Sequence, residues 1–321
     1  MNLVLLDADT LGSDLDLSSL EAFGDLEVYD ITTPEETADN IVGAEAIITN
    51  KVVIDRPLME ATPTLKLICV AATGMNNIDL EAAQELGITV KNVAGYSTTS
   101  VAQHTFAMLL HIAEKMEYYS LYARGGAWSQ SLIFTHLEQP FHQIKGQQWG
   151  IIGMGAIGQN VARIATAFDA KIVYHSTSGD NADQPYPHLA LDELLRTSDI
   201  VSIHAPLNDR TRNLLNADNL PLLRDGAVLL NLGRGGIIDE KALAAELDRR
   251  ELYAGLDVTE TEPIPSYNPL MHIQHIERLL MTPHIAWASV EARQKLLEGI
   301  VDNIRDFLST PIESPLQNSH T

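Results

Sequence analysis

Residues 149–159 read WGIIGMGAIGQ, and the rest of the chain is arranged around the glycines Gly153, Gly155 and Gly158. The apolar run GIIG is typical of the end of a buried parallel strand, and AIGQNVARIATAF carries apolar residues at helical spacing. The first glycine permits a tight turn, the second lets a pyrophosphate approach the backbone, and the third lets the helix pack closely on the strand. This order predicts a dinucleotide-binding unit, with the pyrophosphate at the positive end of the helix dipole.

Length and composition are those of a globular protein with room for two domains. The chain has 321 residues, 45% of them hydrophobic, and no uninterrupted apolar run reaches the length of a membrane span. Its formal net charge of −22 disfavours nucleic acids and anionic membranes as partners. The one cysteine, Cys69, excludes internal disulfides and cysteine-based zinc sites, and no metal site is expected. Met1 begins directly in a strand-like segment, so we expect no targeting peptide and a cytoplasmic location.

Strand-like and helix-like segments alternate through residues 1–97 and again from residue 146 to an amphipathic helix at 291–308. This alternation predicts an α/β fold with two doubly wound parallel sheets, in which a Rossmann dinucleotide-binding domain is inserted in a flavodoxin-like substrate domain. The expected boundaries are 1–99 and 289–321 for the substrate (catalytic) domain and 100–288 for the NAD(P)-binding domain.

The segment 98–119 is predicted to form one long helix, because apolar residues fill most of its positions. A helix that is apolar nearly all round is buried in a large core or against a second subunit. We therefore expect it to pair two copies of the chain in a two-fold symmetric homodimer through the cofactor domains. The segment 120–143 is expected to be an irregular connection.

Three polar residues lie at the ends of predicted strands: Arg234 in NLGRGG, Glu262 in LDVTETEP and His284 in TPHIAWAS. Each alone has an ordinary explanation, as a salt bridge in a turn, a solvated carboxylate or a strand cap. Together they lie on the ligand side of the sheet and suit the reduction of an α-keto acid. The guanidinium can hold a carboxylate or carbonyl oxygen, the imidazole can supply a proton, and the carboxylate can orient the imidazole.

Beyond these residues, the chain resembles the D-isomer-specific 2-hydroxyacid dehydrogenases from end to end. The resemblance is carried by VAATGMNNIDLEAA, GYSTTSVAQHT, GIIGMGAIGQ, SIHAPLN, NLGRGGIIDE, GLDVTETEP and TPHIAWAS. It implies reversible hydride transfer between NAD(P)H and a small 2-keto acid, with Arg234, Glu262 and His284 as catalytic residues. The substrate-binding residues that it implies are Gly74, Met75, Arg234 and His284. The expected cofactor-binding residues are Gly153, Gly155, Ala156, Ile157, Gly158, Ser176, Thr177, His204, Ala205, Pro206, Thr211, Leu232, Gly233, Arg234, Asp257 and His284.

Within that family, the chain is most similar to the glycerate dehydrogenases, also called hydroxypyruvate reductases. The segments that carry this similarity are DADTLGSDLDLSSLEAFG, AGYSTTSVAQHT and the AWAS that follows His284. Gln103 stands where phosphoglycerate dehydrogenases carry Glu. The similarity implies hydroxypyruvate or glyoxylate as substrate and D-glycerate or glycolate as product. The alternatives are phosphoglycerate or D-lactate dehydrogenase and, in a different class, an NADH-sensing scaffold similar to a corepressor. The intact trio of Arg, Glu and His disfavours the scaffold.

The sequence leaves open whether the cofactor is NAD(H) or NADP(H). An acidic residue near the end of the second strand ordinarily receives the adenine-ribose hydroxyls and disfavours NADP. Here that strand ends in YHSTS at 174–178, and the first acid is Asp180. Neutral hydroxyls and a histidine accommodate a 2′-phosphate, but no Arg or Lys follows to neutralise it. NADP use is permitted by this pattern and not demanded.

Overall fold

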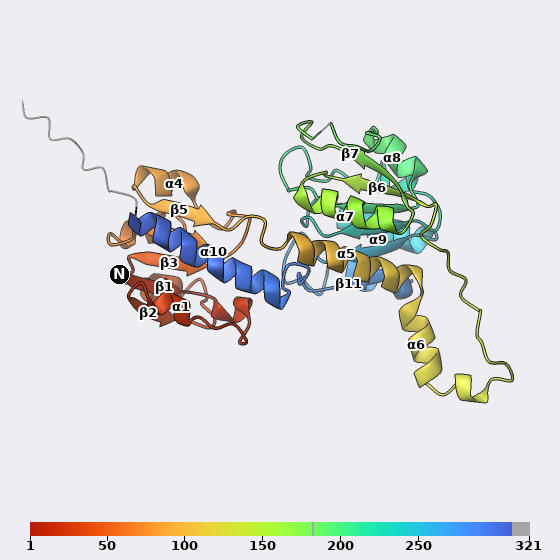
Figure 1. Cartoon of the computed structure of the whole chain (residues 1–321), viewed down its shortest axis with the longest axis horizontal. Coiled ribbons are helices and arrows are strands. Elements are labelled where there is room, and N and C mark those ends of the chain that lie inside the picture. Colours follow the sequence, from red (N-terminus) through yellow and green to blue (C-terminus); the bar gives the residue numbers. More distant parts are fainter. Residues whose placement is uncertain (182, 310–321) are drawn as a thin grey trace, which may run out of the picture. The chain divides into compact units, whose positions relative to one another are not determined.

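The structure, a computed structural model, describes residues 1–181 and 183–309. The chain divides into two compact units (Figure 1), one formed by Met1–Tyr96 and the segment from Ala288 onward, the other by Ser97–Trp287. These divisions lie close to the boundaries expected at 99/100 and 288/289. Residues 310–321 of the expected substrate domain lie outside the described residues. The second unit is thus an insertion in the first.

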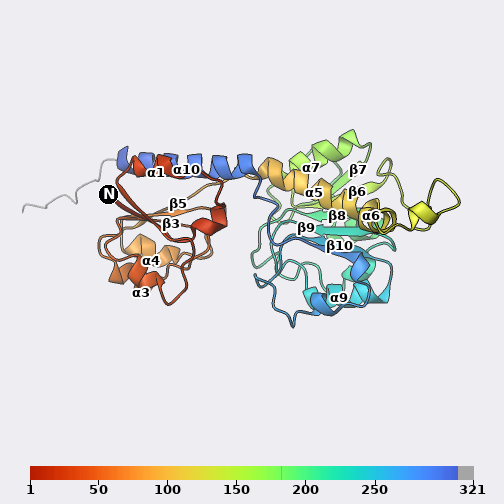
Figure 2. The ribbon, with the colours of Figure 1, turned by 90° about the horizontal axis from the view of Figure 1, so that it is seen from below.

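The first unit is a five-stranded parallel sheet with the order β2-β1-β3-β4-β5, which is the flavodoxin-like order. Its strands are β1 (Asn2–Leu5), β2 (Asp25–Val28), β3 (Ala46–Thr49), β4 (Leu67–Val70) and β5 (Thr89–Asn92). Its helices are η1 (Ala8–Leu11), α1 (Ser18–Glu21), α2 (Thr37–Asn40), α3 (Arg56–Ala61), α4 (Leu80–Glu85) and α10 (Val290–Ser309). In Figure 2, α1 and α10 cover one face of the sheet and α3 and α4 the other, so β3 and β4 are buried throughout.

Asp79 and Gly299 explain how α4 begins and how α10 packs. The side chain of Asp79 accepts a hydrogen bond of 2.9 Å from the backbone nitrogen of Ala82 and so caps the N-terminus of α4. The C-terminal helix α10 packs on the first sheet as predicted. A Cβ at Gly299 would crowd the side chain of Val93, so a glycine lets α10 lie close to the end of β5.

The second unit is a six-stranded parallel sheet with the order β11-β10-β9-β8-β6-β7. Its strands are β6 (Gln148–Ile152), β7 (Lys171–His175), β8 (Ile200–Ile203), β9 (Val228–Asn231), β10 (Tyr253–Leu256) and β11 (Leu279–Met281). After β7 the chain crosses to β8 on the opposite side of β6. The strand order therefore reverses beside β6, and open α/β sheets bind their ligands at such a switch point. Two parallel sheets with flanking helices confirm the predicted α/β fold.

Helices cover both faces of this second sheet, as Figure 2 shows. They are α5 (Thr98–Ala113) and α7 (Ala156–Ala167) on one face, and α9 (Glu240–Arg249) on the other. The remaining elements are α8 (Leu191–Thr197), η3 (Leu220–Leu222), η4 (Pro269–His272) and η5 (Ile276–Arg278). On the α5 side, the ring of the fully buried Trp149 lies 5.0 Å from that of Phe106, tilted by 51°, and its indole nitrogen donates a hydrogen bond to Ser202 Oγ. These helices pack on the sheet, and because all of its strands are parallel, their carboxyl ends lie together at one edge.

The prediction of one helix over 98–119 is wrong, because the chain breaks between two helices there. Helix α5 ends at Ala113, Lys115 adopts a left-handed conformation with φ of 52°, and α6 (Met116–Arg124) begins at the next residue. The Lys115 ammonium lies 3.4 Å from the centre of the Tyr253 ring, and burial lowers its pKa below the ordinary value. This cation–π contact with β10 fixes the break, which the apolar spacing of the sequence does not reveal.

The apolar side chains of α5 are used inside their own unit. Those that are buried there are Val101, Ala102, Phe106, Met108, Leu109 and Ile112. The premise that this helix needs a second subunit to cover its surface therefore does not hold. The segment 116–143, named the arm here, extends from the sheet instead and contains α6 and η2 (Trp128–Gln130), followed by irregular chain (Figure 1).

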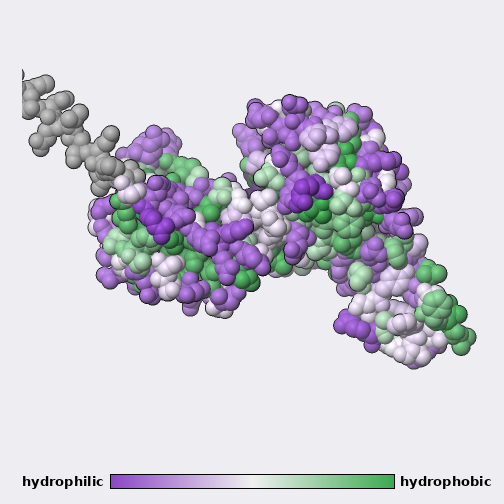
Figure 3. Space-filling view, viewed as in Figure 1, coloured by the Kyte–Doolittle hydropathy of each residue, from purple (hydrophilic) through white to green (hydrophobic). Residues whose placement is uncertain are grey.

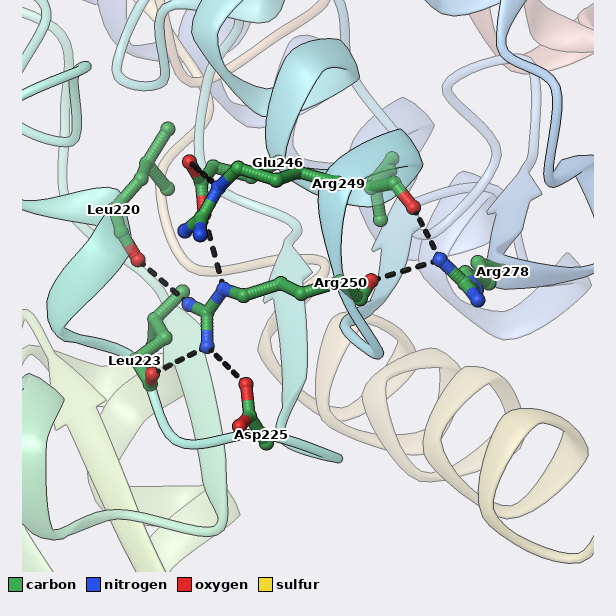
Figure 4. Close-up of polar contacts among 8 residues, drawn as sticks. Leu220, Leu223, Asp225, Glu246, Arg249, Arg250 and Arg278 are labelled. Carbon is green, nitrogen blue, oxygen red and sulfur yellow. Dashed lines mark hydrogen bonds and ion pairs between the residues drawn. The ribbon is translucent and has the colours of Figure 1, made fainter.

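An ion-pair network fixes the C-terminal end of α9 (Figure 4). Arg250 donates to Glu246 at 2.9 Å, to Asp225 at 2.9 Å and to the carbonyl oxygens of Leu220 and Leu223. Burial acts to raise the pKa of Glu246, but hydrogen bonds from Arg249 and Arg250 bring it below its ordinary value. The network precedes β9 and β10 at their amino ends, which is the edge opposite the candidate site. Its role is to hold the fold.

Candidate active site

The glycine loop joins β6 to α7. Gly153 has φ of 93°, and a Cβ there would lie 2.8 Å from the backbone nitrogen of Ala205. A Cβ on Gly158 would collide with the carbonyl oxygen of Gly153, so the helix can begin this close to the loop only with a glycine. Gly155 is the N-cap of α7 and gives the helix no side-chain cap, and none of the described atoms lies within 4 Å of its Cβ position. The N–H groups at this helix start and the open space over Gly155 fit a pyrophosphate.

The end of β7 lies directly beside the glycine loop. The carbonyl oxygen of His175 accepts a hydrogen bond of 3.0 Å from the backbone nitrogen of Gly153. The next residues, Ser176 and Thr177, are half-buried, and the backbone nitrogen of Ser176 donates to His188 Nε2 at 3.3 Å. Neighbouring strands are about 4.8 Å apart, so a ribose attached to a pyrophosphate on the glycine loop would lie over these residues.

The loop after β8 lies on the other side of the glycine loop from the end of β7. The buried hydroxyl of Thr211 holds this loop in place. This hydroxyl donates to the carbonyl oxygen of Pro206 at 2.6 Å and accepts from the backbone nitrogen of Asn208 at 2.8 Å. Ala205 packs against Gly153, as described above. The structure therefore uses Thr211, expected to bind cofactor, to fix the loop that faces the glycines.

His204 lies at the start of that loop with a neutral ring. Burial lowers its pKa to about 3. Its Nε2 lies 3.0 Å from Ser202 Oγ, while its Nδ1 is buried with no partner among the described residues. A neutral ring gives no charge for binding a phosphate.

Glu262 and His284 form the closest pair of functional groups at the carboxyl ends of β10 and β11. His284 Nδ1 lies 2.7 Å from Glu262 Oε2, and the two side chains are 24% and 33% exposed, respectively. The other oxygen, Glu262 Oε1, accepts a hydrogen bond of 3.1 Å from the backbone nitrogen of Thr259. The carboxylate therefore holds one ring nitrogen of His284, and the opposite nitrogen, Nε2, is the one left to meet a substrate.

Asp257, at the end of β10, organises the segment that carries His284. Its buried carboxylate accepts hydrogen bonds from Thr282 Oγ1 at 2.6 Å and from the backbone nitrogens of Ile285 and Ala286, both at 2.9 Å. His284 itself adopts φ of 54°, and its backbone nitrogen donates to the carbonyl oxygen of Asp257 at 2.9 Å. Asp257, expected to bind the cofactor, is thus a positioning residue for the imidazole.

Sequence reasoning missed His104, which extends this network onto α5. His104 Nε2 lies 3.1 Å from Thr282 Oγ1 and 3.7 Å from Asp257 Oδ1. The sequence offered one signal, the polar pair of Gln103 and His104 in a helix whose other buried positions are mostly apolar. A partly buried imidazole on such a helix needs a polar partner, and the structure supplies it at the base of the His284 segment.

Arg234 lies on the loop after β9, next to the loop that carries Glu262. The buried side chain of Asn231 fixes this loop by donating to the carbonyl oxygen of Arg234 at 2.9 Å and accepting from the nitrogen of Gly233 at 3.1 Å. A Cβ on Gly235 would collide with the backbone of Thr259, so the two loops touch. Arg234 is half-buried and donates to the carbonyl oxygen of Gly233 at 2.9 Å. No other described side chain bonds the guanidinium.

In the first unit, Gly74 and Met75 lie on the loop after β4. Asn77 closes this loop against the loop after β3, since its side chain donates to the carbonyl oxygen of Val52 at 2.9 Å. The loop after β3 is held in turn by the buried carboxylate of Asp7, which accepts from several of its backbone nitrogens. The backbone around Gly74 is therefore fixed on the ligand edge of the first sheet.

Within the second unit, the structure brings the expected cofactor residues to one edge of the sheet, after β6, β7, β8, β9, β10 and β11. They are Gly153, Gly155, Ala156, Ile157, Gly158, Ser176, Thr177, His204, Ala205, Pro206, Thr211, Leu232, Gly233, Arg234, Asp257 and His284. Gly74 and Met75 belong to the first unit.

Comparison with known proteins decides the family. Residues 106–286 match the family model described as "D-isomer specific 2-hydroxyacid dehydrogenase, NAD binding domain". A hydroxypyruvate reductase of Blautia hydrogenotrophica is 36% identical over 96% of this chain and 97% of its own length. The chain belongs to the D-isomer-specific 2-hydroxyacid dehydrogenase family. This membership confirms the resemblance stated from the sequence motifs.

Two solved structures extend the match of this 2-hydroxyacid dehydrogenase to its whole fold. The TT0316 protein from Thermus thermophilus is 35% identical, with a TM-score of 0.85, and the match covers 96% of this chain and 97% of that one. An acyclic imino acid reductase in complex with NADPH is 30% identical, with a TM-score of 0.83, and the match again covers 96% and 97%. The second unit of this dehydrogenase is thus the NAD(P)-binding Rossmann domain, and the chain is an NAD(P)-dependent oxidoreductase.

The described part of the dehydrogenase lacks two kinds of feature. No helix within residues 1–181 and 183–309 has the length and apolar character needed to cross a membrane. Over the same ranges, no three His, Cys, Asp or Glu side chains are grouped so that they could hold a metal ion.

Proposed function

We propose that this dehydrogenase reduces hydroxypyruvate or glyoxylate to D-glycerate or glycolate, using Arg234, Glu262 and His284. The contact between Glu262 and His284, 2.7 Å from carboxylate to imidazole, carries the proposal. The name of the Blautia relative, hydroxypyruvate reductase, supports the choice of substrate. When bound, the nicotinamide cofactor supplies or receives the hydride.

In the direction of reduction, His284 gives the proton to the carbonyl oxygen of the substrate. Glu262 orients the ring through Nδ1 and stabilises its protonated form, which leaves Nε2 directed to the substrate. In the direction of oxidation, the neutral ring accepts the proton of the hydroxyl group. The Arg234 guanidinium binds the carboxylate or the carbonyl oxygen, for which its fork of N–H groups is suited. The backbone N–H groups of Gly74 and Met75 bind the substrate carboxylate.

A panel of 2-keto acids tests this proposal. The loss of absorbance of NADH and of NADPH is followed with hydroxypyruvate, glyoxylate, pyruvate and 3-phosphohydroxypyruvate. We expect the highest kcat/KM for hydroxypyruvate or glyoxylate, a loss of about 10²–10⁴-fold in His284→Gln, and no loss in the control His272→Gln, whose ring contacts a backbone carbonyl near η4. Preference for the phosphorylated acid or for pyruvate would identify a phosphoglycerate or D-lactate dehydrogenase. Cofactor binding without turnover on any acid would support a corepressor-like scaffold.

We also propose a homodimer that forms through the cofactor domains and is held by the arm, residues 116–143. The arm folds on itself, because the ring of His136 stacks on Tyr122 at 3.7 Å and bonds the hydroxyl of Tyr118 at 2.7 Å. Its tip leaves large apolar side chains in water, with Leu132 and Phe134 101% and 88% exposed. Figure 3 shows this apolar surface gathered at the end of the arm. A second copy of the chain fits such a surface, since a symmetric pair buries both tips at once.

Analytical ultracentrifugation tests the dimer. The wild-type chain should sediment as a dimer at micromolar concentration, and the double change Leu132→Asp with Phe134→Asp should give a folded monomer. The control is Val42→Asp, which changes an apolar side chain of the first unit that is 78% exposed and should leave the dimer intact. A wild-type monomer would refute the proposal.

We place the enzyme in the cytoplasm. Its one cysteine, Cys69, is buried in β4, and burial raises the pKa of the thiol to about 12. The fold thus uses no disulfide, which suits a reducing compartment. Cell fractionation with an antibody against the chain would check the location.

A further inference from the structure

The segment directly after β7 contains no Arg or Lys, but the fold brings an arginine there from a distant loop. The Arg210 side chain crosses from the loop after β8 and donates from Nη1 to the carbonyl oxygen of Ser178 at 3.2 Å. Ser178 belongs to the segment that follows β7. A guanidinium therefore lies beside the residues over which the adenine-side ribose would lie, although 32 residues separate it from Ser178 along the chain.

The backbone that carries Arg210 is fixed. Its nitrogen donates to Asn208 Oδ1 at 2.9 Å, and the next residue, Thr211, is fully buried and holds the loop through its hydroxyl. The opposite side is also fixed, because Ser176 Oγ accepts from the nitrogen of Gly179 at 3.0 Å and shapes the turn after β7. The loop that carries the guanidinium and the turn that carries the half-buried hydroxyl groups are thus each fixed by their own hydrogen bonds, and the contact of Arg210 with Ser178 joins them.

The charge of Arg210 is not used inside the protein. Six other arginines of the second unit form ion pairs with carboxylates, namely Arg196, Arg212, Arg224, Arg249, Arg250 and Arg278. No described carboxylate forms an ion pair with Arg210, which is exposed at the ligand edge of the sheet. In a chain of net charge −22, an exposed guanidinium without a carboxylate partner is a place where an anion can be bound.

We propose that Arg210, together with the hydroxyl groups of Ser176 and Thr177, forms a subsite for the 2′-phosphate of NADP(H), so that this chain binds NADP(H) more tightly than NAD(H). The proposal rests on the part of the proposed function that places a dinucleotide on the glycine loop. Burial of a phosphate against a guanidinium and hydroxyl groups gives charge-assisted hydrogen bonds. The acid that would repel such a phosphate is absent from 175–178. The first acid after it is Asp180, whose backbone nitrogen donates to Ser178 Oγ at 3.1 Å and whose carboxylate forms no ion pair with Arg210 within the described residues.

Equilibrium binding of fragments without a nicotinamide tests the subsite separately from catalysis. Isothermal titration calorimetry compares 2′,5′-ADP with 5′-AMP, which differ only by the 2′-phosphate. We expect the wild-type chain to bind 2′,5′-ADP at least about 10-fold more tightly. Arg210→Gln should remove about 10- to 100-fold of the affinity for 2′,5′-ADP and leave that for 5′-AMP unchanged. Arg196→Gln, which removes an exposed arginine of α8, is the matched control and should change neither.

Two outcomes would overturn the subsite. One is equal binding of the two fragments by the wild-type chain. The other is a pair of results: Arg210→Gln keeps its affinity for 2′,5′-ADP, and Asp180→Asn loses its affinity for 5′-AMP. Together these results would show that Asp180 receives an unphosphorylated ribose. Failure of the proposed function has a different signature, since 2′,5′-ADP and NADPH would still bind but no 2-keto acid would be reduced.

Discussion

The contact between Glu262 and His284 predicts how the enzyme responds when the carboxylate loses its charge. Two unit charges about 4 Å apart attract each other by about 4 kcal/mol at an effective dielectric constant of about 20. The two side chains are 24% and 33% exposed, so water reduces this attraction to about 1–2 kcal/mol. Glu262→Gln keeps the shape and a hydrogen-bonding oxygen but removes that attraction.

Because 1.4 kcal/mol corresponds to a factor of ten, Glu262→Gln should slow reduction about tenfold, since the carboxylate no longer attracts the imidazole that delivers the proton. Oxidation passes through the same transition state, so it should slow by a similar factor.

The assay is kcat/KM for hydroxypyruvate and for D-glycerate between pH 5 and 10, with cofactor affinity measured beside it. Glu260→Gln is the control, since Glu260 lies on the same loop and pairs with Arg212. If the profile of Glu262→Gln coincides with that of the wild type while His284→Gln is inactive, the carboxylate does not act through the imidazole. If both variants keep near-full activity, another group or water protonates the product.

Three further outcomes are expected. Arg234→Lys should lower kcat and raise KM together, by about 10–100-fold in kcat/KM, because an ammonium cannot make a two-pronged contact. Gly158→Ala should lower the melting temperature and abolish NADPH binding, since its Cβ would collide with the carbonyl oxygen of Gly153, whereas Gly155→Ala should fold normally and weaken only cofactor binding. The pKa of His204 is about 3 in the folded protein, against 6.5 for an ordinary histidine, so at mildly acidic pH the unfolded chain binds a proton that the folded chain does not. The free energy of unfolding should therefore fall by about 2–3 kcal/mol between pH 6.5 and 4.5. Chemical denaturation of His204→Leu should show a flatter dependence on pH.

The glycine loop, the alternation of strands and helices, and the polar ends of β9, β10 and β11 could be predicted because their signals are local. A strand, a tight turn and a helix follow one another between Gln148 and Ala167, and parallel strands bring their carboxyl ends to one edge. The sequence alone therefore indicated that Glu262 and His284 lie near each other. The distance of 2.7 Å between them is the contribution of the structure.

Features set by contacts between distant residues could not be predicted. The break between α5 and α6 depends on Lys115 meeting Tyr253. The contact of Arg210 with Ser178 joins two loops that follow different strands, so a search for a basic residue directly after β7 misses it. In both cases the deciding partner lies far along the chain, beyond the range of turn and periodicity signals.

The segment that carries His284 shows what such distant contacts achieve. A left-handed backbone at a residue other than glycine costs on the order of 1 kcal/mol or more and persists only where its surroundings hold it. Here the hold is the buried carboxylate of Asp257, which bonds Thr282 before His284 and two backbone nitrogens after it. Glu262 then fixes the ring from its other side. An imidazole held at both its backbone and its ring needs no rearrangement when the proton moves, and such preorganisation is where enzymes gain much of their rate.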